Sequence, residues 1–90
     1  MSKTAEEARG EGPARLKIGA VSRLTGLSVH VLRKWEDRYH AVRPVRTPGG
    51  GRLYELTDVN RLMLIKQLAA GGMSLSDLAP LSLDRLEELA

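Results

Sequence analysis

The chain has 90 residues, of which 42% are hydrophobic and 28% are charged, and it contains no cysteine. This length suffices for one small domain with a modest core. The lack of cysteine excludes disulfides and thiolate metal sites and fits a reducing compartment. With no apolar run of transmembrane length and no signal-peptide pattern, the sequence predicts a cytoplasmic protein that has no membrane partner.

The formal net charge of +3 hides an uneven distribution along the chain. From Arg15 to Tyr54 there are nine Lys or Arg residues and only two acids, Glu36 and Asp37. That stretch carries +7, so the remainder carries −4. A basic stretch in an otherwise balanced chain favours a polyanionic partner bound by one face; the alternative is a solvated basic surface.

The first elements expected are a tail, a short strand and a helix. Residues 1–14 are polar without a periodic apolar face, which predicts a disordered tail. Residues 16–18 are expected to form a short strand or an extended entry. A helix over about residues 19–25 would follow, and Gly26 stands where a left-handed glycine commonly ends a helix.

The second predicted helix spans residues 28–39. Ser28 is a good N-cap residue, and a stripe at helical spacing predicts a buried face: Leu27, Val31, Leu32, Trp35 and Tyr39. The opposite face carries Val29, His30, Arg33, Lys34 and Asp37. Two short helices joined by a turn that contains glycine indicate a helix-turn-helix.

A β-hairpin, or wing, is predicted next. Residues 45–47 and 52–54 favour strands, and Pro48-Gly49-Gly50-Gly51 lies between them. Pro48 and Gly49 suit the two central positions of a type II turn. A flexible linker is the alternative for such a glycine-rich stretch. A phosphate-binding loop is not expected, because Arg52-Leu53 stands where the Lys-Ser/Thr pair would be needed.

The last part of the chain predicts further helices. Thr57 is expected to cap a helix over residues 58–70 that is apolar enough to be covered on two sides, with Arg61 and Lys66 pointing outward. Ser74 would cap a short helix that Pro80 ends, and Ser82 a final segment with leucine at every third position. The predicted class is mainly α: a winged helix-turn-helix domain over residues 15–81 with a helix pair after the wing. Residues 82–90 would begin a linker or a further helix of a longer protein.

Catalysis is not predicted. His30 and His40 are the only imidazoles, and neither a Ser–His–acid arrangement nor a zinc ligand set accompanies them. The predicted chemistry is DNA binding, with His30, Arg33 and Lys34 within reach of base edges and phosphates. Arg38 would contact phosphate or pair with an acid, and Trp35 would lie mainly in the core. The full candidate set is Ser28, His30, Arg33, Lys34, Trp35, Arg38, Arg43, Arg46, Arg52 and Tyr54.

Several motifs in order resemble the MerR family of bacterial transcription regulators. They are Ile18-Gly19 through Gly26-Leu27-Ser28, Leu32-Arg33-Lys34-Trp35-Glu36-Asp37-Arg38-Tyr39, Pro48-Gly49-Gly50-Gly51-Arg52-Leu53-Tyr54 and Thr57-Asp58-Val59. The resemblance implies binding to double-stranded promoter DNA as a homodimer or higher oligomer. One helix would enter the major groove, and the wing would touch the backbone or minor groove. By position, Arg33, Trp35, Arg52 and Tyr54 match residues that typically contact DNA.

The tryptophan form of the motif over residues 32–39 resembles the subgroup in which a cobalamin-binding module follows; relatives without cobalamin share it. No cofactor is expected in these 90 residues. His40 and Gly51 depart from the residues usual at their positions. RNA polymerase or an anti-repressor protein that mimics DNA would be a further partner. The alternative function is a protein-binding adaptor whose basic face docks an acidic partner. Single-stranded or RNA binding is a minor option, because aromatic stacking residues are scarce.

Overall fold

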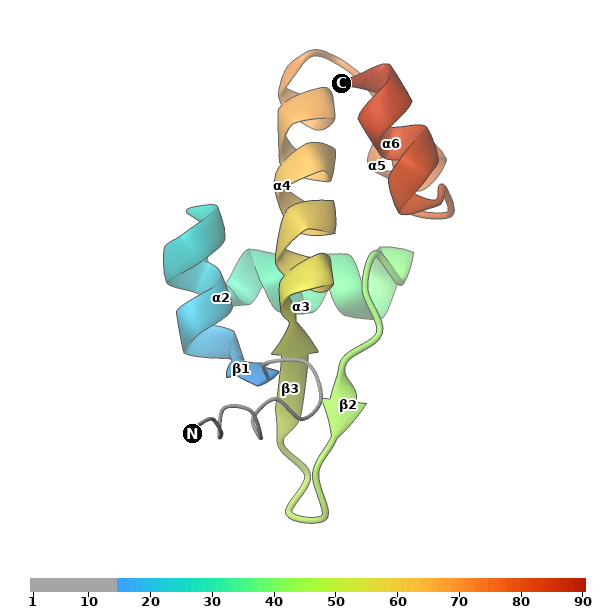
Figure 1. Cartoon of the computed structure of the whole chain (residues 1–90). Coiled ribbons are helices and arrows are strands. Elements are labelled where there is room, and N and C mark those ends of the chain that lie inside the picture. Colours follow the sequence, from blue (N-terminus) through green and yellow to red (C-terminus); the bar gives the residue numbers. More distant parts are fainter. Residues whose placement is uncertain (1–14) are drawn as a thin grey trace, which may run out of the picture.

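The computed structural model describes residues 15–90, so the tail predicted over residues 1–14 lies outside the described residues. Its elements are β1 (Arg15–Lys17), α2 (Ile18–Thr25), α3 (Val29–Tyr39), β2 (Val45–Arg46), β3 (Arg52–Glu55), α4 (Leu56–Ala70), α5 (Leu75–Leu78) and α6 (Leu83–Leu89). Helix α4 runs through the middle of the molecule, with the sheet below it and α5 and α6 beside its far end (Figure 1). The predicted class, a winged helix-turn-helix followed by a helix pair, is confirmed.

The turn between α2 and α3 is held by side chains as well as backbone. Gly26 adopts the left-handed conformation, with φ of 77°, as predicted for the residue that ends the helix. The buried Thr25 hydroxyl donates to the carbonyl of Val21 and accepts from the backbone N–H of Leu27. The ammonium of Lys66 donates to the carbonyl of Thr25 at 2.9 Å. Helix α4 therefore helps to hold the turn that sets the orientation of α3.

The predicted cap and buried stripe of α3 are confirmed. The Ser28 hydroxyl accepts from the N–H of Val31 at 3.1 Å, which satisfies one donor of the first turn. Leu32 and Trp35 are buried, and Tyr39 is half-buried. The helix ends at His40, whose φ is 53°. Histidine tolerates this left-handed conformation better than most non-glycine residues, so α3 can end at His40 without a glycine.

The three strands form one antiparallel sheet in the order β1-β3-β2. Leu16 of β1 pairs with Tyr54 of β3, and Arg46 of β2 pairs with Arg52 of β3. The predicted wing, formed by β2 and β3, is thus confirmed, and β1 is the third strand of the sheet. The first strand covers the edge of β3 that the wing leaves open.

The predicted type II turn at the tip of the wing is wrong. The N–H of Gly50 donates to the carbonyl of Thr47 at 2.9 Å, and the positive φ of 85° falls on Gly50 instead of Gly49. The tip is therefore a type I turn followed by a left-handed glycine, a common three-residue hairpin loop. The hydroxyl of Thr47 also accepts from the N–H of Gly51 at 2.9 Å.

Helix α4 begins at Leu56, two residues earlier than expected, and Glu55 occupies the N-cap position instead of Thr57. The reason is Asp58, whose carboxylate accepts from the backbone N–H of Glu55 at 2.8 Å. The prediction that Arg61 points outward is also wrong, because its guanidinium donates to backbone carbonyls of two loops. The buried residues of α4 are Val59, Leu62, Ile65 and Leu68.

Two short helices complete the fold. Ser74 precedes α5, but its hydroxyl lies 2.8 Å from that of Ser76 and caps no backbone N–H. Ser82 caps α6 as predicted, accepting from the N–H of Arg85 at 3.1 Å. Leu78 and Leu86 are fully buried and extend the core along α4. Among residues 15–90, no helix has the length and apolar character needed to span a membrane.

Candidate nucleic-acid interface

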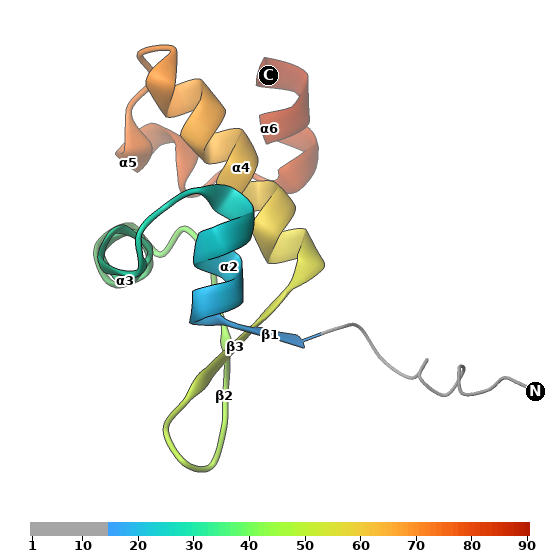
Figure 2. The same ribbon diagram turned by 90° about the vertical axis from the view of Figure 1, so that its left-hand side faces the viewer.

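The outer face of α3 presents exposed polar and basic side chains. His30, Arg33 and Lys34 are all exposed, and so is the cap residue Ser28. Figure 2 looks nearly along α3 and shows it at one edge of the molecule, with the wing below it and α5 above it on the same side. The face that carries these side chains therefore lies on an open edge of the fold.

A hollow of about 700 Å³ separates α3 from the wing. It brings together cations from four elements: Lys17 of β1, Arg33 of α3, Arg46 of β2 and Arg52 of β3. The backbone of Gly49, Gly50 and Gly51 completes its rim. Cations distant in the sequence thus share one concave basic surface, which is suited to a polyanion.

Lys17 is absent from the predicted set. It belongs to the surface because β1 pairs with β3 and places Lys17 opposite Leu53. The pairing partner of an isolated three-residue strand is not encoded in its own sequence pattern. Only its positive charge, at the start of the basic stretch, could have indicated a role.

Arg52 is held between two consecutive acids of α3. Its Nε lies 3.3 Å from Oε2 of Glu36, and its Nη2 lies 3.7 Å from Oδ1 of Asp37. The Glu36 side chain is 7% exposed and the Arg52 side chain 22% exposed. A buried carboxylate needs such a partner, because removing an unpaired charge from water is costly. Arg52 is therefore both a structural partner of α3 and a lining residue of the hollow.

Tyr54 is a core residue and not an exposed wing residue, which corrects its predicted place on the contact surface. It is 1% exposed, and its hydroxyl donates to Oε1 of Glu36 at 2.9 Å. Burial and the neighbouring Glu36 carboxylate raise the pKa of Tyr54 to about 12. Trp35 is 8% exposed and packs in the same core. Both aromatic rings therefore pack in the core that supports α3.

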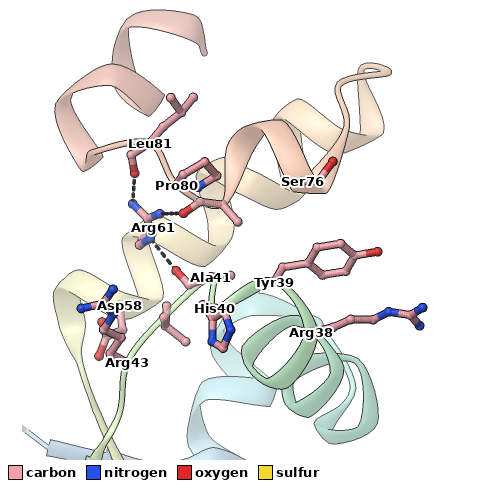
Figure 3. A pocket seen from close by; sticks show the side chains of 12 residues that line it. Arg38, Tyr39, His40, Ala41, Arg43, Asp58, Arg61, Ser76, Pro80 and Leu81 are labelled. Carbon is pink, nitrogen blue, oxygen red and sulfur yellow. Dashed lines mark hydrogen bonds between the residues drawn. The ribbon is translucent and has the colours of Figure 1, made fainter.

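A second hollow, of about 660 Å³, lies between the end of α3 and α5. Its lining includes Arg38, Tyr39 and Arg43. Figure 3 shows Arg38 and Tyr39 projecting to one side, away from Arg43, which lies on the side of Asp58. Within residues 15–90, Arg38 forms no ion pair with an acid, and the nearby carboxylate of Glu36 pairs with Arg52 instead. Arg38 and Arg43 are both exposed.

Arg61 of α4 lines this second hollow and joins α4 to two loops. Its Nε donates to the carbonyl of Ala41 at 2.6 Å, and its Nη1 to that of Leu81 at 2.5 Å. Its Nη2 donates to the carbonyl of Ala79, and Figure 3 shows all three bonds. Burial lowers the pKa of Arg61. The guanidinium thus fastens the loop after α3 to the turn between α5 and α6.

The interface offers no evident metal centre. Over residues 15–90, no three His, Asp or Glu side chains come together closely enough to hold an ion. The groups on the open edge are cations, hydroxyls, backbone amides and one exposed acid, Asp37. Such an arrangement can neutralise and hydrogen-bond a phosphate backbone.

The fold and this surface define a helix-turn-helix regulatory protein. Residues 16–82 match the family model described as MerR HTH family regulatory protein, and the chain belongs to this family. The resemblance drawn from the sequence motifs is confirmed at the level of the family. The cation-lined hollow and the buried Glu36 thus lie within the region that the family model matches.

Three relatives illustrate the range of similar proteins. The chain is 37% identical to the HTH-type transcriptional repressor CarH of Myxococcus xanthus over 73 residues, 81% of this chain and 24% of CarH. It is 40% identical to the HTH-type transcriptional regulator TnrA of Bacillus subtilis over 63 residues, 70% of this chain and 56% of TnrA. It is 37% identical to the regulator MlrA of Escherichia coli K12 over 59 residues, 66% of this chain and 24% of MlrA. The similarity therefore covers about a quarter of CarH and MlrA and about half of TnrA.

Proposed function

We propose that residues 15–81 form a sequence-specific double-stranded DNA-binding domain of a transcription regulator. In this proposal α3 enters the major groove, and the wing lies on the adjacent backbone or minor groove. The observation that carries it is the convergence of Lys17, Arg33, Arg46 and Arg52 on one hollow beside α3. Family membership supports the same conclusion.

The proposed contacts divide by what each side chain can reach. Arg33 reads base edges, because its exposed planar fork matches the two acceptors of guanine. His30 and Lys34 lie on the same face and contact bases or nearby phosphates. Ser28 can donate its hydroxyl proton to a phosphate, because its oxygen accepts the cap hydrogen bond.

The remaining cations are proposed to grip the phosphate backbone on the two flanks of α3. Arg46 and Arg52 act from the wing side, and Arg38 and Arg43 from the side of the second hollow. Phosphate contacts orient the domain and carry little sequence information. Trp35 and Tyr54 act indirectly by packing behind α3 and β3.

Titration of labelled duplex DNA at two salt concentrations tests the proposal. Selection from a random-sequence duplex pool supplies the preferred site. We expect micromolar or tighter binding that weakens steeply with salt, because each neutralised phosphate releases counterions. Absence of binding to any duplex at low salt would contradict the proposal and favour a basic face that docks an acidic protein.

For the whole protein we propose regulation of promoters in the bacterial cytoplasm by a homodimer or higher oligomer, with RNA polymerase or an anti-repressor protein as a further partner. The tryptophan motif of residues 32–39 also supports a cobalamin-binding module after residue 90. Sedimentation of the full-length protein tests its oligomeric state. To test for the cofactor, the full-length protein is incubated with cobalamin and passed through gel filtration. An absorption spectrum then shows whether cobalamin stays bound to the protein.

A further inference from the structure

One acidic side chain stands among the cations on the open face of α3. Asp37 lies one helical turn after Arg33 and Lys34, so all three share a face. Its side chain is 65% exposed, and its charge opposes the rest of the surface. A carboxylate in this position repels an approaching phosphate, so its presence on a DNA-binding face requires an explanation.

The two acids that flank Arg52 differ in how firmly they are held. Glu36 is buried, and the Tyr54 hydroxyl holds its carboxylate by a hydrogen bond of 2.9 Å. If Arg52 moved away, the charge of this buried carboxylate would lose its cationic partner. Asp37 is exposed, and its 3.7 Å separation from Nη2 of Arg52 exceeds hydrogen-bond length. The Asp37 contact is therefore electrostatic, screened by solvent and easily released.

We propose that Asp37 competes with DNA phosphate for the guanidinium of Arg52 and so lowers the affinity of the domain for duplex DNA of any sequence. Glu36 keeps Arg52 in place, while a phosphate that approaches Nη2 must displace Asp37. This inference rests on the proposed function. Phosphate contacts are independent of sequence, so the competition weakens binding to every duplex. A larger share of the affinity for the preferred site then comes from base contacts.

The test uses the whole 90-residue chain and a labelled duplex of random sequence at low and high salt. We expect Asp37→Asn to bind about two- to fivefold more tightly at low salt, the range typical of an exposed ion pair. The gain should shrink at high salt, where screening weakens both the ion pair and the repulsion. Asp84→Asn is the matched control, because it removes the same charge from an exposed position of α6.

A double variant separates competition at Arg52 from a general charge effect. In the Arg52→Ala background the guanidinium is absent, so Asp37→Asn should give a clearly smaller gain than it gives with Arg52 present. Thermal unfolding of each variant followed by circular dichroism shows that the compared proteins are folded at the temperature of the titration. An equal gain in both backgrounds would overturn the role of Arg52.

The other outcomes also decide between explanations. Unchanged or weaker binding of Asp37→Asn to random duplex overturns the inference while leaving the proposed function intact. Loss of a cytosine preference at one selected position, without a gain on random duplex, would make Asp37 a base reader and overturn the competition. Failure of the unaltered chain to bind any duplex overturns the proposed function and this inference together.

Discussion

Glu36 of α3 and Tyr54 of β3 are joined by a buried hydrogen bond of 2.9 Å across 18 residues of sequence. Arg52 lies two residues before Tyr54, so both side chains project from one face of β3 toward the same carboxylate. The helix that carries Arg33 is thereby fastened to the strand that carries one arm of the wing. The two proposed DNA-contacting elements are held in a fixed relation before any DNA binds.

The pKa of Tyr54 should report on its hydrogen bond with Glu36. Its pKa is raised from 10.0 to about 12 in the folded protein, so folding favours the neutral phenol. This stabilising contribution is present in full below pH 10 and is lost as the pH rises to about 12. Absorbance titration of tyrosinate should therefore show one late step near pH 12.

Two variants show which tyrosine gives the titration step near pH 12. Tyr54→Phe should abolish the late step, whereas Tyr39→Phe should leave it in place. The free energy of unfolding of the unaltered protein should fall more steeply between pH 10 and 12 than that of Tyr54→Phe. A late step that survives in Tyr54→Phe would contradict the assignment.

Arg33→Ala should reduce affinity for the selected duplex by about 1–3 kcal/mol and relax preference at one base position. The reason is that its exposed fork is the group on α3 best suited to a bidentate base contact. Fluorescence anisotropy on the selected and a random duplex measures the effect. Arg85→Ala in α6 controls for the loss of one positive charge. Equal losses on both duplexes would remove Arg33 as a base reader.

Arg52→Ala should weaken binding to every duplex and flatten the dependence of the binding constant on salt by about one phosphate contact. It should also lower the free energy of unfolding by about 1–3 kcal/mol, because Glu36 loses a charged partner inside the fold. Binding is compared at a temperature where circular dichroism shows both proteins folded. An unchanged salt dependence would show that Arg52 serves stability alone.

Arg61→Ala should lower the free energy of unfolding by about 2–4 kcal/mol, because three backbone carbonyls lose a charged donor. Arg61→Lys should recover only part of the loss, since one ammonium cannot reproduce the fork of the guanidinium. Urea denaturation measures both. Arg85→Ala, which removes an exposed pair with Glu88, should cost less than about 1 kcal/mol. Equal losses of unfolding free energy in Arg61→Ala and Arg85→Ala would show that the hydrogen bonds of Arg61 to the two loops do not stabilise the fold.

The tip of the wing offers a matched pair of glycines. Gly50→Ala should destabilise the protein by about 1–2 kcal/mol, because φ at Gly50 is 85°, a conformation that strains residues with a Cβ. Gly49→Ala should be nearly neutral, since the space around Gly49 is open and its φ is not positive. Thermal unfolding distinguishes them. The reverse order would restore the type II turn that the sequence suggested.

The sequence predicted α3 and the wing because local signals determine them. The cap at Ser28, the stripe through Leu32 and Trp35 and the glycine-rich tip are all short-range patterns. The turn type at the tip was wrong because three consecutive glycines leave the position of the positive φ undetermined. Similarly, Thr57 looked like the cap of α4, but the carboxylate of Asp58 reaches the N–H of Glu55 and starts the helix earlier.

Long-range partners were beyond the reach of the sequence. No structural role was predicted for Glu36, yet its side chain is buried and is contacted by Arg52 and Tyr54 of β3. Arg61 looked like an outward-pointing cation, yet the loops after α3 and α5 offer it carbonyls. Lys17 joins the candidate surface through strand pairing alone. Each of these depends on residues at least 16 positions away in the sequence, which helical or strand periodicity cannot reveal.

The guanidinium of Arg61 has a mechanical consequence. The carbonyl of Ala41 follows α3, whereas those of Ala79 and Leu81 belong to the turn that leads into α6. A movement of α6 away from α3 would therefore strain or break hydrogen bonds of Arg61, so one side chain links the position of α6 to the end of α3.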